Sequence, residues 1–209
     1  MFKAFFKERY IKKKYKNFVT DEKLNYDFSK SPNRLVFINA AIAKIYSNKK
    51  SCRYLEIGCD ENKVFNYVAV PDPFKIGVDP VQGGNIKATS DNFFKKNLDK
   101  FDIIFIDGLH EYEQTQRDII NSLDVLNVGG LILIHDMLPL DWKSEFVPRI
   151  QKNWLGDVWK CGYELSQSIN LEFKIIKADN GIGIIKKVFG IILLSISVKL
   201  FSSNISLIV

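Results

Sequence analysis

The sequence predicts an α/β protein with a doubly wound, mostly parallel sheet that ends in an antiparallel hairpin. The first observation is that short apolar runs alternate with stretches of helical pattern between residues 31 and 187. The second is that the strongest runs, "FDIIFID" and "LILIHD", are almost continuously apolar, which is typical of strands covered by helices on both faces. The third is a pair of final apolar runs separated by Asn180-Gly181, which is typical of a β-hairpin.

The first half of the domain supplies three predicted strands. A helix is expected over "NRLVFINAAIAKIYS", with Ser31 as its N-cap and Pro32 at its first position. "CRYLEIG" predicts a strand that ends at Gly58, and a helical stretch, "ENKVFNYVA", follows it. "FKIGVD" and the weaker "NIKATS" predict the second and third strands, before a helix over "DNFFKKNLDK" whose start is favoured by Ser90 or Asp91.

The second half contains the clearest elements. "FDIIFID" is the strongest strand pattern in the chain. "EYEQTQRDIINSLDVL" predicts a helix with acidic residues in its first turn, where the helix dipole favours them. A turn from Asn127 to Gly130 then leads into the strand "LILIHD", and the hairpin closes the sheet.

Length and cysteine content fit one ordinary domain in a reducing compartment. The 209 residues can bury a core without disulfides or metals as staples. Cys52, Cys59 and Cys161 form no CxxC pair and leave an odd count, which favours reduced thiols and a cytoplasmic location. We expect a basic, aromatic N-terminal arm over 1–30, a domain over 31–187 and an apolar tail over 188–209.

Charge is concentrated at the N-terminus. Residues 1–16 contain seven Lys/Arg and one Glu, whereas the rest of the chain has 23 basic and 23 acidic residues. The neutral domain therefore gives no reason to expect a nucleic-acid partner. The arm has the composition of a weak peripheral membrane contact, with a solvated extension packed on the domain as the alternative. In the tail, Lys199 and five serines make a membrane span less favoured than an interfacial or protein-packed segment.

The predicted strands end in polar residues. In a doubly wound sheet the ligand lies beyond the carboxyl ends of the strands. Both histidines of the chain, His110 and His135, follow apolar strands and lie close to an Asp. The side chains expected along this edge are those of Glu56, Cys59, Asp60, Asp79, Ser90, Asp91, Asp107, His110, His135 and Asp136.

"LEIGCDEN" resembles motif I of the class I S-adenosylmethionine-dependent methyltransferases, an acid followed by a glycine-rich loop, although Asp60 stands where another glycine is common. The resemblance implies a Rossmann-like, seven-stranded sheet and binding of S-adenosylmethionine. Glu56, Gly58 and Asp60 would form the cofactor loop. Asp79 in "IGVDP" would bind the ribose hydroxyls, and Asp91 would contact the adenine.

The segment from Phe101 to Pro139 resembles a subgroup of small bacterial methyltransferases, which includes macrocin O-methyltransferase and the cephalosporin hydroxylase family. The resemblance implies an O-methyltransferase, with a small molecule or a glycan as acceptor and a sugar hydroxyl in polysaccharide or glycoconjugate biosynthesis as the expected target. It also implies a divalent metal held by Asp107, Asp136 and His135, and Asp107 belongs to the cofactor site as well.

Two kinds of chemistry stay open at this stage. Carboxylates suit Mg²⁺, whereas a histidine ligand shifts the preference toward metals such as Mn²⁺. Alternatively, a histidine is the general base, since its ordinary pKa of about 6.5 suits proton removal near neutral pH. Of the two candidate catalytic residues, His110 is preferred to His135.

Two other functions also stay open. An NAD-dependent oxidoreductase is disfavoured because "GCDENK" lacks the spaced glycines that seat a pyrophosphate. A non-catalytic nucleoside-binding or scaffold protein on the same fold is compatible with the degenerate motif I. Tryptophans between the fifth and sixth strands, Trp142, Trp154 and Trp159, would either stack on a sugar or pack against the sheet. The sequence does not predict the oligomeric state.

Overall fold

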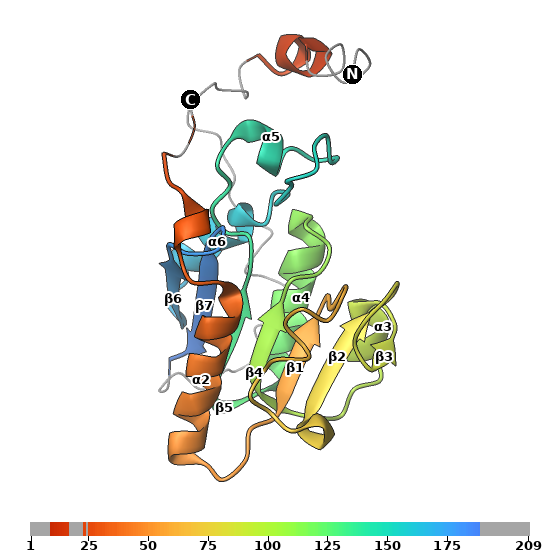
Figure 1. The fold of residues 1–209 in the computed structure, drawn as a ribbon, viewed down its shortest axis with the longest axis vertical. Coiled ribbons are helices and arrows are strands. Elements are labelled where there is room, and N and C mark those ends of the chain that lie inside the picture. Colours follow the sequence, from red (N-terminus) through yellow and green to blue (C-terminus); the bar gives the residue numbers. More distant parts are fainter. Residues whose placement is uncertain (1–8, 17–22, 24, 189–209) are drawn as a thin grey trace.

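A computed structural model of the chain describes residues 9–16, 23 and 25–188. Seven strands form one sheet in the order β3-β2-β1-β4-β5-β7-β6. The first five strands are parallel, and β7 is antiparallel to both β5 and β6. The predicted mostly parallel sheet with a terminal antiparallel hairpin is therefore confirmed (Figure 1).

The strands lie where the apolar runs predict them. The parallel strands are β1 (Tyr54–Ile57), β2 (Lys75–Asp79), β3 (Ile86–Lys87), β4 (Phe101–Ile106) and β5 (Leu126–Ile134). The hairpin consists of β6 (Leu171–Ile176) and β7 (Ile182–Lys187). All six residues of β4 are buried, as expected for a central strand covered on both faces.

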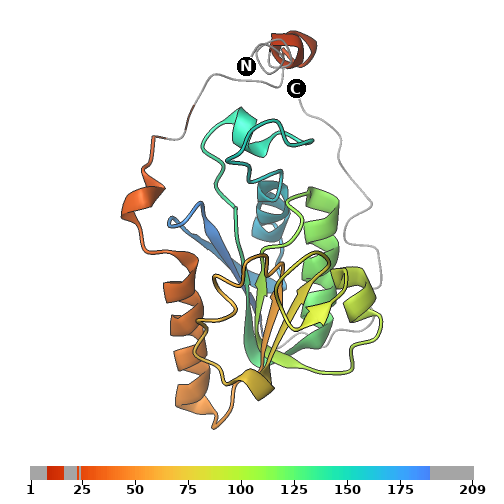
Figure 2. The same ribbon diagram turned by 45° about the vertical axis from the view of Figure 1, so that its right-hand side comes forward.

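Helices cover both faces of the sheet. They are α2 (Arg34–Asn48), α3 (Ser90–Phe94), α4 (Tyr112–Val125), α5 (Trp142–Glu145) and α6 (Trp159–Ser166), with short 3-10 turns η1 (Phe28–Lys30) and η2 (Asp72–Phe74). Figure 2 shows α2 on one side of the sheet and α4 on the other. Alternate residues of β4 accordingly enter two cores, with Ile103 and Phe105 on the α2 side and Ile104 and Ile106 on the α4 side.

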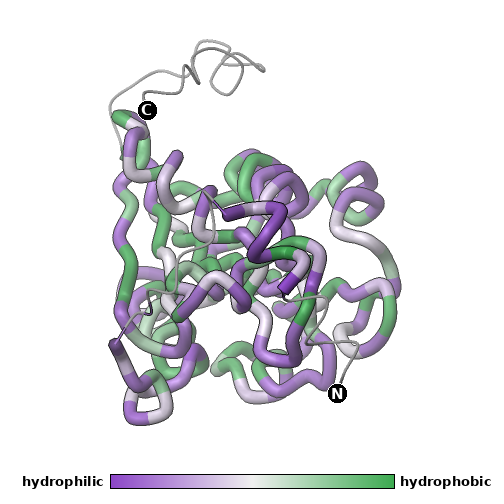
Figure 3. Tube along the Cα trace, turned by 90° about the horizontal axis from the view of Figure 1, so that it is seen from above, coloured by the Kyte–Doolittle hydropathy of each residue, from purple (hydrophilic) through white to green (hydrophobic). Residues whose placement is uncertain are grey.

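The apolar interior follows from this layering. Seen from above, hydrophobic segments gather in the middle of the trace, with hydrophilic segments mostly around them (Figure 3). Cys52, Cys59 and Cys161 are free and buried. Among the described residues, none of the helices combines the length and apolar character that a bilayer span requires. Apart from Val188, the apolar tail predicted over 188–209 lies outside the described residues.

Three local predictions were wrong. Asn33, rather than Ser31, caps α2, because the Ser31 hydroxyl donates to Phe28 O and accepts from the Asp179 N–H. The helix expected over "ENKVFNYVA" is a series of turns, in which Asn62 has a φ of 60° and accepts a hydrogen bond from the Gly84 N–H. The turn expected at 127–130 is part of β5, whose Gly129 has a φ of 78°.

Candidate active site

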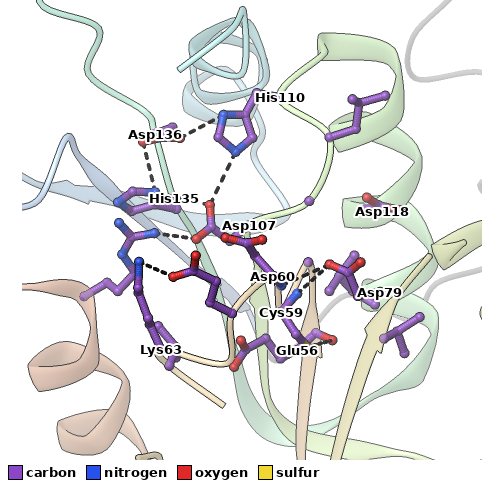
Figure 4. A pocket seen from close by; sticks show the side chains of 18 of the residues that line it. Glu56, Cys59, Asp60, Lys63, Asp79, Asp107, His110, Asp118, His135 and Asp136 are labelled. Atoms are coloured by element: carbon purple, nitrogen blue, oxygen red, sulfur yellow. Dashed lines mark hydrogen bonds and ion pairs between the residues drawn. The ribbon is translucent and has the colours of Figure 1, made fainter. Parts of the chain in front are cut away.

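A cavity of about 1000 Å³ opens at the carboxyl ends of the parallel strands. This is the edge at which doubly wound sheets bind ligands, and the volume suits a nucleoside-sized cofactor with an acceptor. Among the predicted site residues, all of which the structure describes, only Asp91 lies outside the lining. The sequence therefore predicted correctly which side chains converge here (Figure 4), namely Glu56, Gly58, Asp60, Asp79, Asp107, His110, His135 and Asp136.

The loop after β1 is held by Asp79 from the end of β2. One Asp79 oxygen accepts the N–H groups of Cys59 and Asp60, each at 3.1 Å, and the other accepts those of Val81 and Gln82 at 2.8 and 2.9 Å. Burial raises the pKa of Asp79, but these four donors outweigh it and lower the pKa. Asp79 thus fixes the loop after β1 in place, and it also borders the cavity.

Gly58 allows the ends of β1 and β4 to approach each other. Its φ is 86°, and a Cβ there would lie 2.1 Å from the carbonyl oxygen of Asp107. Any other residue would push the cofactor loop away from Asp107, since L side chains rarely adopt this backbone conformation. The degenerate motif therefore keeps the glycine that its geometry requires.

Glu56 lies at the bottom of this loop and is almost fully buried. The hydroxyl of Tyr54 donates to Glu56 Oε2 at 2.6 Å. Burial is the main cause that raises the pKa of Glu56 to about 8, so this carboxyl is largely protonated near neutral pH.

A second polar group borders the cavity beside α3 and α4. The side-chain amide of Gln114 donates to Ser90 Oγ at 3.1 Å and to Asp118 Oδ1 at 3.0 Å. Asp91, expected to contact adenine, accepts from the same amide at 3.3 Å but does not line the cavity. Burial raises the pKa of Asp118 to about 6. The sequence did not single out Gln114 or Asp118.

The most distinctive group consists of Asp107, His110 and Asp136. His110 Nδ1 lies 3.2 Å from Asp136 Oδ2, and His110 Nε2 lies 3.6 Å from Asp107 Oδ1. Burial lowers the pKa of His110, but the two carboxylates outweigh it and raise the pKa. Asp136 occupies the left-handed region with a φ of 61°, directly after the strand pairing of β5 ends. Strained residues of this kind cluster at functional sites.

His135 lies behind this group rather than on the open side. It is 3% exposed, with Nδ1 2.9 Å from Asp136 Oδ1 and 3.3 Å from Asp107 Oδ1, and Nε2 3.5 Å from Asp179 Oδ1. Burial lowers the pKa of His135, and the surrounding carboxylates raise it well above its usual value. His135 thus supports the carboxylates, whereas the more accessible His110 borders the open cavity.

Two residues that the sequence analysis missed complete the group. Arg34, in the first turn of α2, donates to Asp107 and, at 3.0 Å from Nε, to Asp179 Oδ2. Charges of His135 and Arg34 and several hydrogen bonds lower the pKa of Asp179 in spite of its burial. The sequence held a partial signal, because a helix start and a hairpin turn both point toward the carboxyl end of a sheet of this topology.

Trp154 forms the wall over His110. The two rings stack with centroids 5.6 Å apart and planes 21° apart, and the Trp154 indole donates to Phe146 O at 2.7 Å. Gly156 has a φ of 66°, and a Cβ there would lie 1.6 Å from His110 O, so this glycine lets the loop close on His110. Trp142 is buried and Trp159 is partly exposed, and neither lines the cavity. Only one of the three tryptophans is therefore placed to contact an acceptor.

The carboxylate group also fits a divalent metal. One ligand atom from each of Asp107, His110 and Asp136 lies within 4.8 Å of the others. Within the described residues, Asp136 Oδ1 and both nitrogens of His135 are buried without a hydrogen bond of good geometry. These atoms lie within ion-pair distance of one another and of Asp107 and Asp179, so the fit to a metal rests on the convergence of Asp107, His110 and Asp136. The histidine in this group is His110, whereas the sequence analysis expected His135 as the histidine ligand.

Comparisons with known proteins agree with this geometry. Residues 59–137, which include Cys59 and Asp60 of the loop after β1 and the carboxylate group, match a family model described as a methyltransferase domain. This match covers 79 of the 209 residues, and over that stretch the chain is similar to a methyltransferase domain. No curated protein sequence matches it significantly.

Solved structures share the fold of this chain at low sequence identity. A protein from Corynebacterium glutamicum is 9% identical with a TM-score of 0.55, and the match covers 90% of each chain. A putative caffeoyl-CoA O-methyltransferase from Staphylococcus aureus is 15% identical with a TM-score of 0.53, and the match covers 77% of this chain and 87% of that one. An O-methyltransferase from Bacillus cereus, in complex with SAH, is 13% identical with a TM-score of 0.52, and the match covers 86% and 90%.

Proposed function

We propose that this methyltransferase transfers a methyl group from S-adenosylmethionine to a hydroxyl of a sugar ring, in a polysaccharide or another glycoconjugate. The observation that carries the proposal is the group formed by Asp107, His110 and Asp136, which faces the cavity beside the cofactor loop (Figure 4). A hydroxyl is a poor nucleophile until its proton is removed, and this group offers the means of removing it.

The cofactor end of the cavity is assigned to the loop from Gly58 to Asp60 and to Asp79. Methyl transfer from a sulfonium is a displacement in line with the leaving sulfur, so the fixed position of the two reactants supplies much of the rate. Asp79 holds the loop by four hydrogen bonds, and Gly58 keeps it against Asp107. The carboxylates of this cavity also suit the positive charge of the sulfonium.

His110 is assigned as the residue that accepts the proton of the acceptor hydroxyl. Asp136 and Asp107 flank its two nitrogens, so they orient the ring and stabilise the imidazolium that forms. Arg34 and His135 compensate the negative charge of Asp107 from the other side. The hydroxyl oxygen then attacks the methyl carbon, the carbon–sulfur bond breaks, and its electron pair leaves on the sulfur.

A second form of the same site contains a divalent cation. Asp107, His110 and Asp136 would hold it, as the convergence of one ligand atom from each suggests. A cation held there would supply Lewis-acid chemistry that lowers the pKa of the acceptor hydroxyl. In that form His110 is a ligand, and activity depends on the cation rather than on a free imidazole.

The acceptor side of the cavity suits a hydroxylated ring. Trp154 offers an aromatic face beside His110, while Asn153 and Asn180 add amide groups to the lining. An aromatic side chain with nearby hydrogen-bonding groups matches the two sides of a sugar, one less polar face and an edge of hydroxyls. A planar catechol is the competing acceptor.

Calorimetry and a labelled-methyl assay test the proposal together. We expect the protein to bind S-adenosylhomocysteine and not NAD, and to transfer methyl groups to at least one of a panel of methyl hexosides in preference to catechol. If activity survives EDTA, His110 is the base. If EDTA abolishes activity and Mg²⁺ or Mn²⁺ restores it, a bound cation activates the acceptor hydroxyl. Binding of S-adenosylhomocysteine without transfer to any hydroxyl acceptor would favour a non-catalytic nucleoside-binding protein.

A further inference from the structure

The N-terminal helix presents a basic surface on the acceptor side of the molecule. Residues 9–14 are helical, and the segment from Arg9 to Lys16 contains five basic side chains and no acidic one. In Figure 1 this helix lies beyond α5, at the opposite end of the molecule from the C-terminal end of α2. Since the rest of the chain has 25 basic and 24 acidic residues, this segment carries most of the net positive charge of the molecule.

One face of the helix packs inward and the other stays free. Ile11 is 5% exposed, and Tyr15, four residues later, contacts Phe146 with ring centroids 5.8 Å apart. Positions four apart share a helix face, so this contact turns Arg9 and Lys13 away from the protein. Tyr10 is 64% exposed, and Arg9 and Lys13 are exposed as well.

The inward face touches the loop that builds the acceptor wall. Phe146, which contacts Tyr15, accepts a hydrogen bond from the indole of Trp154, and Trp154 stacks on His110. Three successive contacts therefore connect Tyr15 of the basic segment to His110.

We propose that residues 9–16 are a docking surface for an anionic lipid bilayer, which brings the acceptor side of the cavity to the membrane. The exposed tyrosine among the lysines favours a membrane over a nucleic acid, because Tyr side chains are enriched at the membrane–water interface. In the sequence, Phe2, Phe5 and Phe6 precede this segment, so residues 1–16 as a whole have the composition of an amphipathic, membrane-surface peptide. The docking does not depend on the proposed acceptor. A glycan acceptor at a membrane surface would be linked to a lipid.

Co-sedimentation of the full chain with vesicles tests this surface. We expect binding to vesicles of phosphatidylcholine with 30% phosphatidylglycerol, weaker binding to pure phosphatidylcholine, and loss of binding as salt is raised. Each basic residue near an anionic surface contributes about 1 kcal/mol, a factor of about five. The variant R9Q/K13Q/K16Q should therefore bind about 100-fold more weakly.

A matched variant removes the same charge elsewhere. Lys44, Lys50 and Lys96 are exposed and belong to other parts of the surface, so K44Q/K50Q/K96Q should bind like the wild type. S-adenosylhomocysteine affinity, measured in parallel, should be unchanged in both variants, which separates membrane binding from the cofactor site. Equal binding to neutral and anionic vesicles, equal loss in the two variants, or stronger binding to an oligoribonucleotide than to vesicles overturns the proposal.

Discussion

Arg34 and Asp179 are 145 residues apart in the sequence, yet Arg34 Nε lies 3.0 Å from Asp179 Oδ2 at the edge of the cavity. The backbone N–H of Arg34 donates to the same oxygen at 2.6 Å. The pair joins the start of α2 to the β6–β7 hairpin and places the guanidinium beside Asp107. This relationship, rather than any single motif, closes one side of the candidate site.

Replacing Arg34 by Ala should reduce both stability and activity. The change leaves Asp107 and Asp179 without their cation in a partly buried position, so we expect a loss of about 2–3 kcal/mol in the free energy of unfolding, below the range for fully buried pairs. Urea denaturation measures it. A double-mutant cycle with D179A isolates the pair, and strict additivity of the two losses would show that the contact contributes nothing.

The sequence predicted the sheet better than the connections. Continuous apolar runs such as that of β4 are typical of strands between two helical layers, so the order of the strands and the polar edge could be predicted from them. The turns after Gly58 were missed because their apolar residues have helical spacing, whereas hydrogen bonds from distant segments, such as that between Gly84 and Asn62, decide the backbone. Arg34 was missed for a similar reason, since its partners come from other parts of the chain.

Two glycines of similar conformation give a matched test of the cofactor loop. Gly58 and Gly129 have φ values of 86° and 78°, but a Cβ would meet the Asp107 backbone at Gly58 and nothing within 4 Å at Gly129. G129A should lower the free energy of unfolding by about 1–2 kcal/mol, through backbone strain alone. G58A should cost more and should weaken the binding of S-adenosylhomocysteine at least tenfold by calorimetry. Comparable affinity in the two variants would contradict the assigned loop.

Asp118 should make stability depend on pH. Its pKa is raised from 3.8 to about 6 by burial, so the folded state holds the proton more tightly than the unfolded state. The contribution of Asp118 to stability should therefore fall by up to about 3 kcal/mol as pH rises from about 4 to 6, and this contribution should stay level above pH 6. Urea midpoints across this range should show the fall in the wild type and in D124N, an exposed control, but much less of it in D118N.

Trp154 should affect the acceptor and not the cofactor. W154A removes the ring that stacks on His110 and faces the cavity, so the KM for a methyl hexoside should rise about tenfold, equivalent to about 1.4 kcal/mol. W154F keeps an aromatic face and should recover much of this loss. Steady-state kinetics with each substrate varied in turn measure both effects. A change confined to the KM for S-adenosylmethionine would place Trp154 in the cofactor site instead.

Transfer of a labelled methyl group in a single turnover by H110A tests whether His110 activates the acceptor hydroxyl. His110 contacts Asp107 and Asp136, whereas its neighbour Glu111 belongs to the same loop outside that group, so E111Q is the control. We expect H110A to bind S-adenosylhomocysteine like the wild type and to transfer the methyl group 100- to 10,000-fold more slowly, the range for loss of a general acid or base. E111Q should react like the wild type. Unchanged transfer by H110A, with native cofactor affinity, would contradict the account.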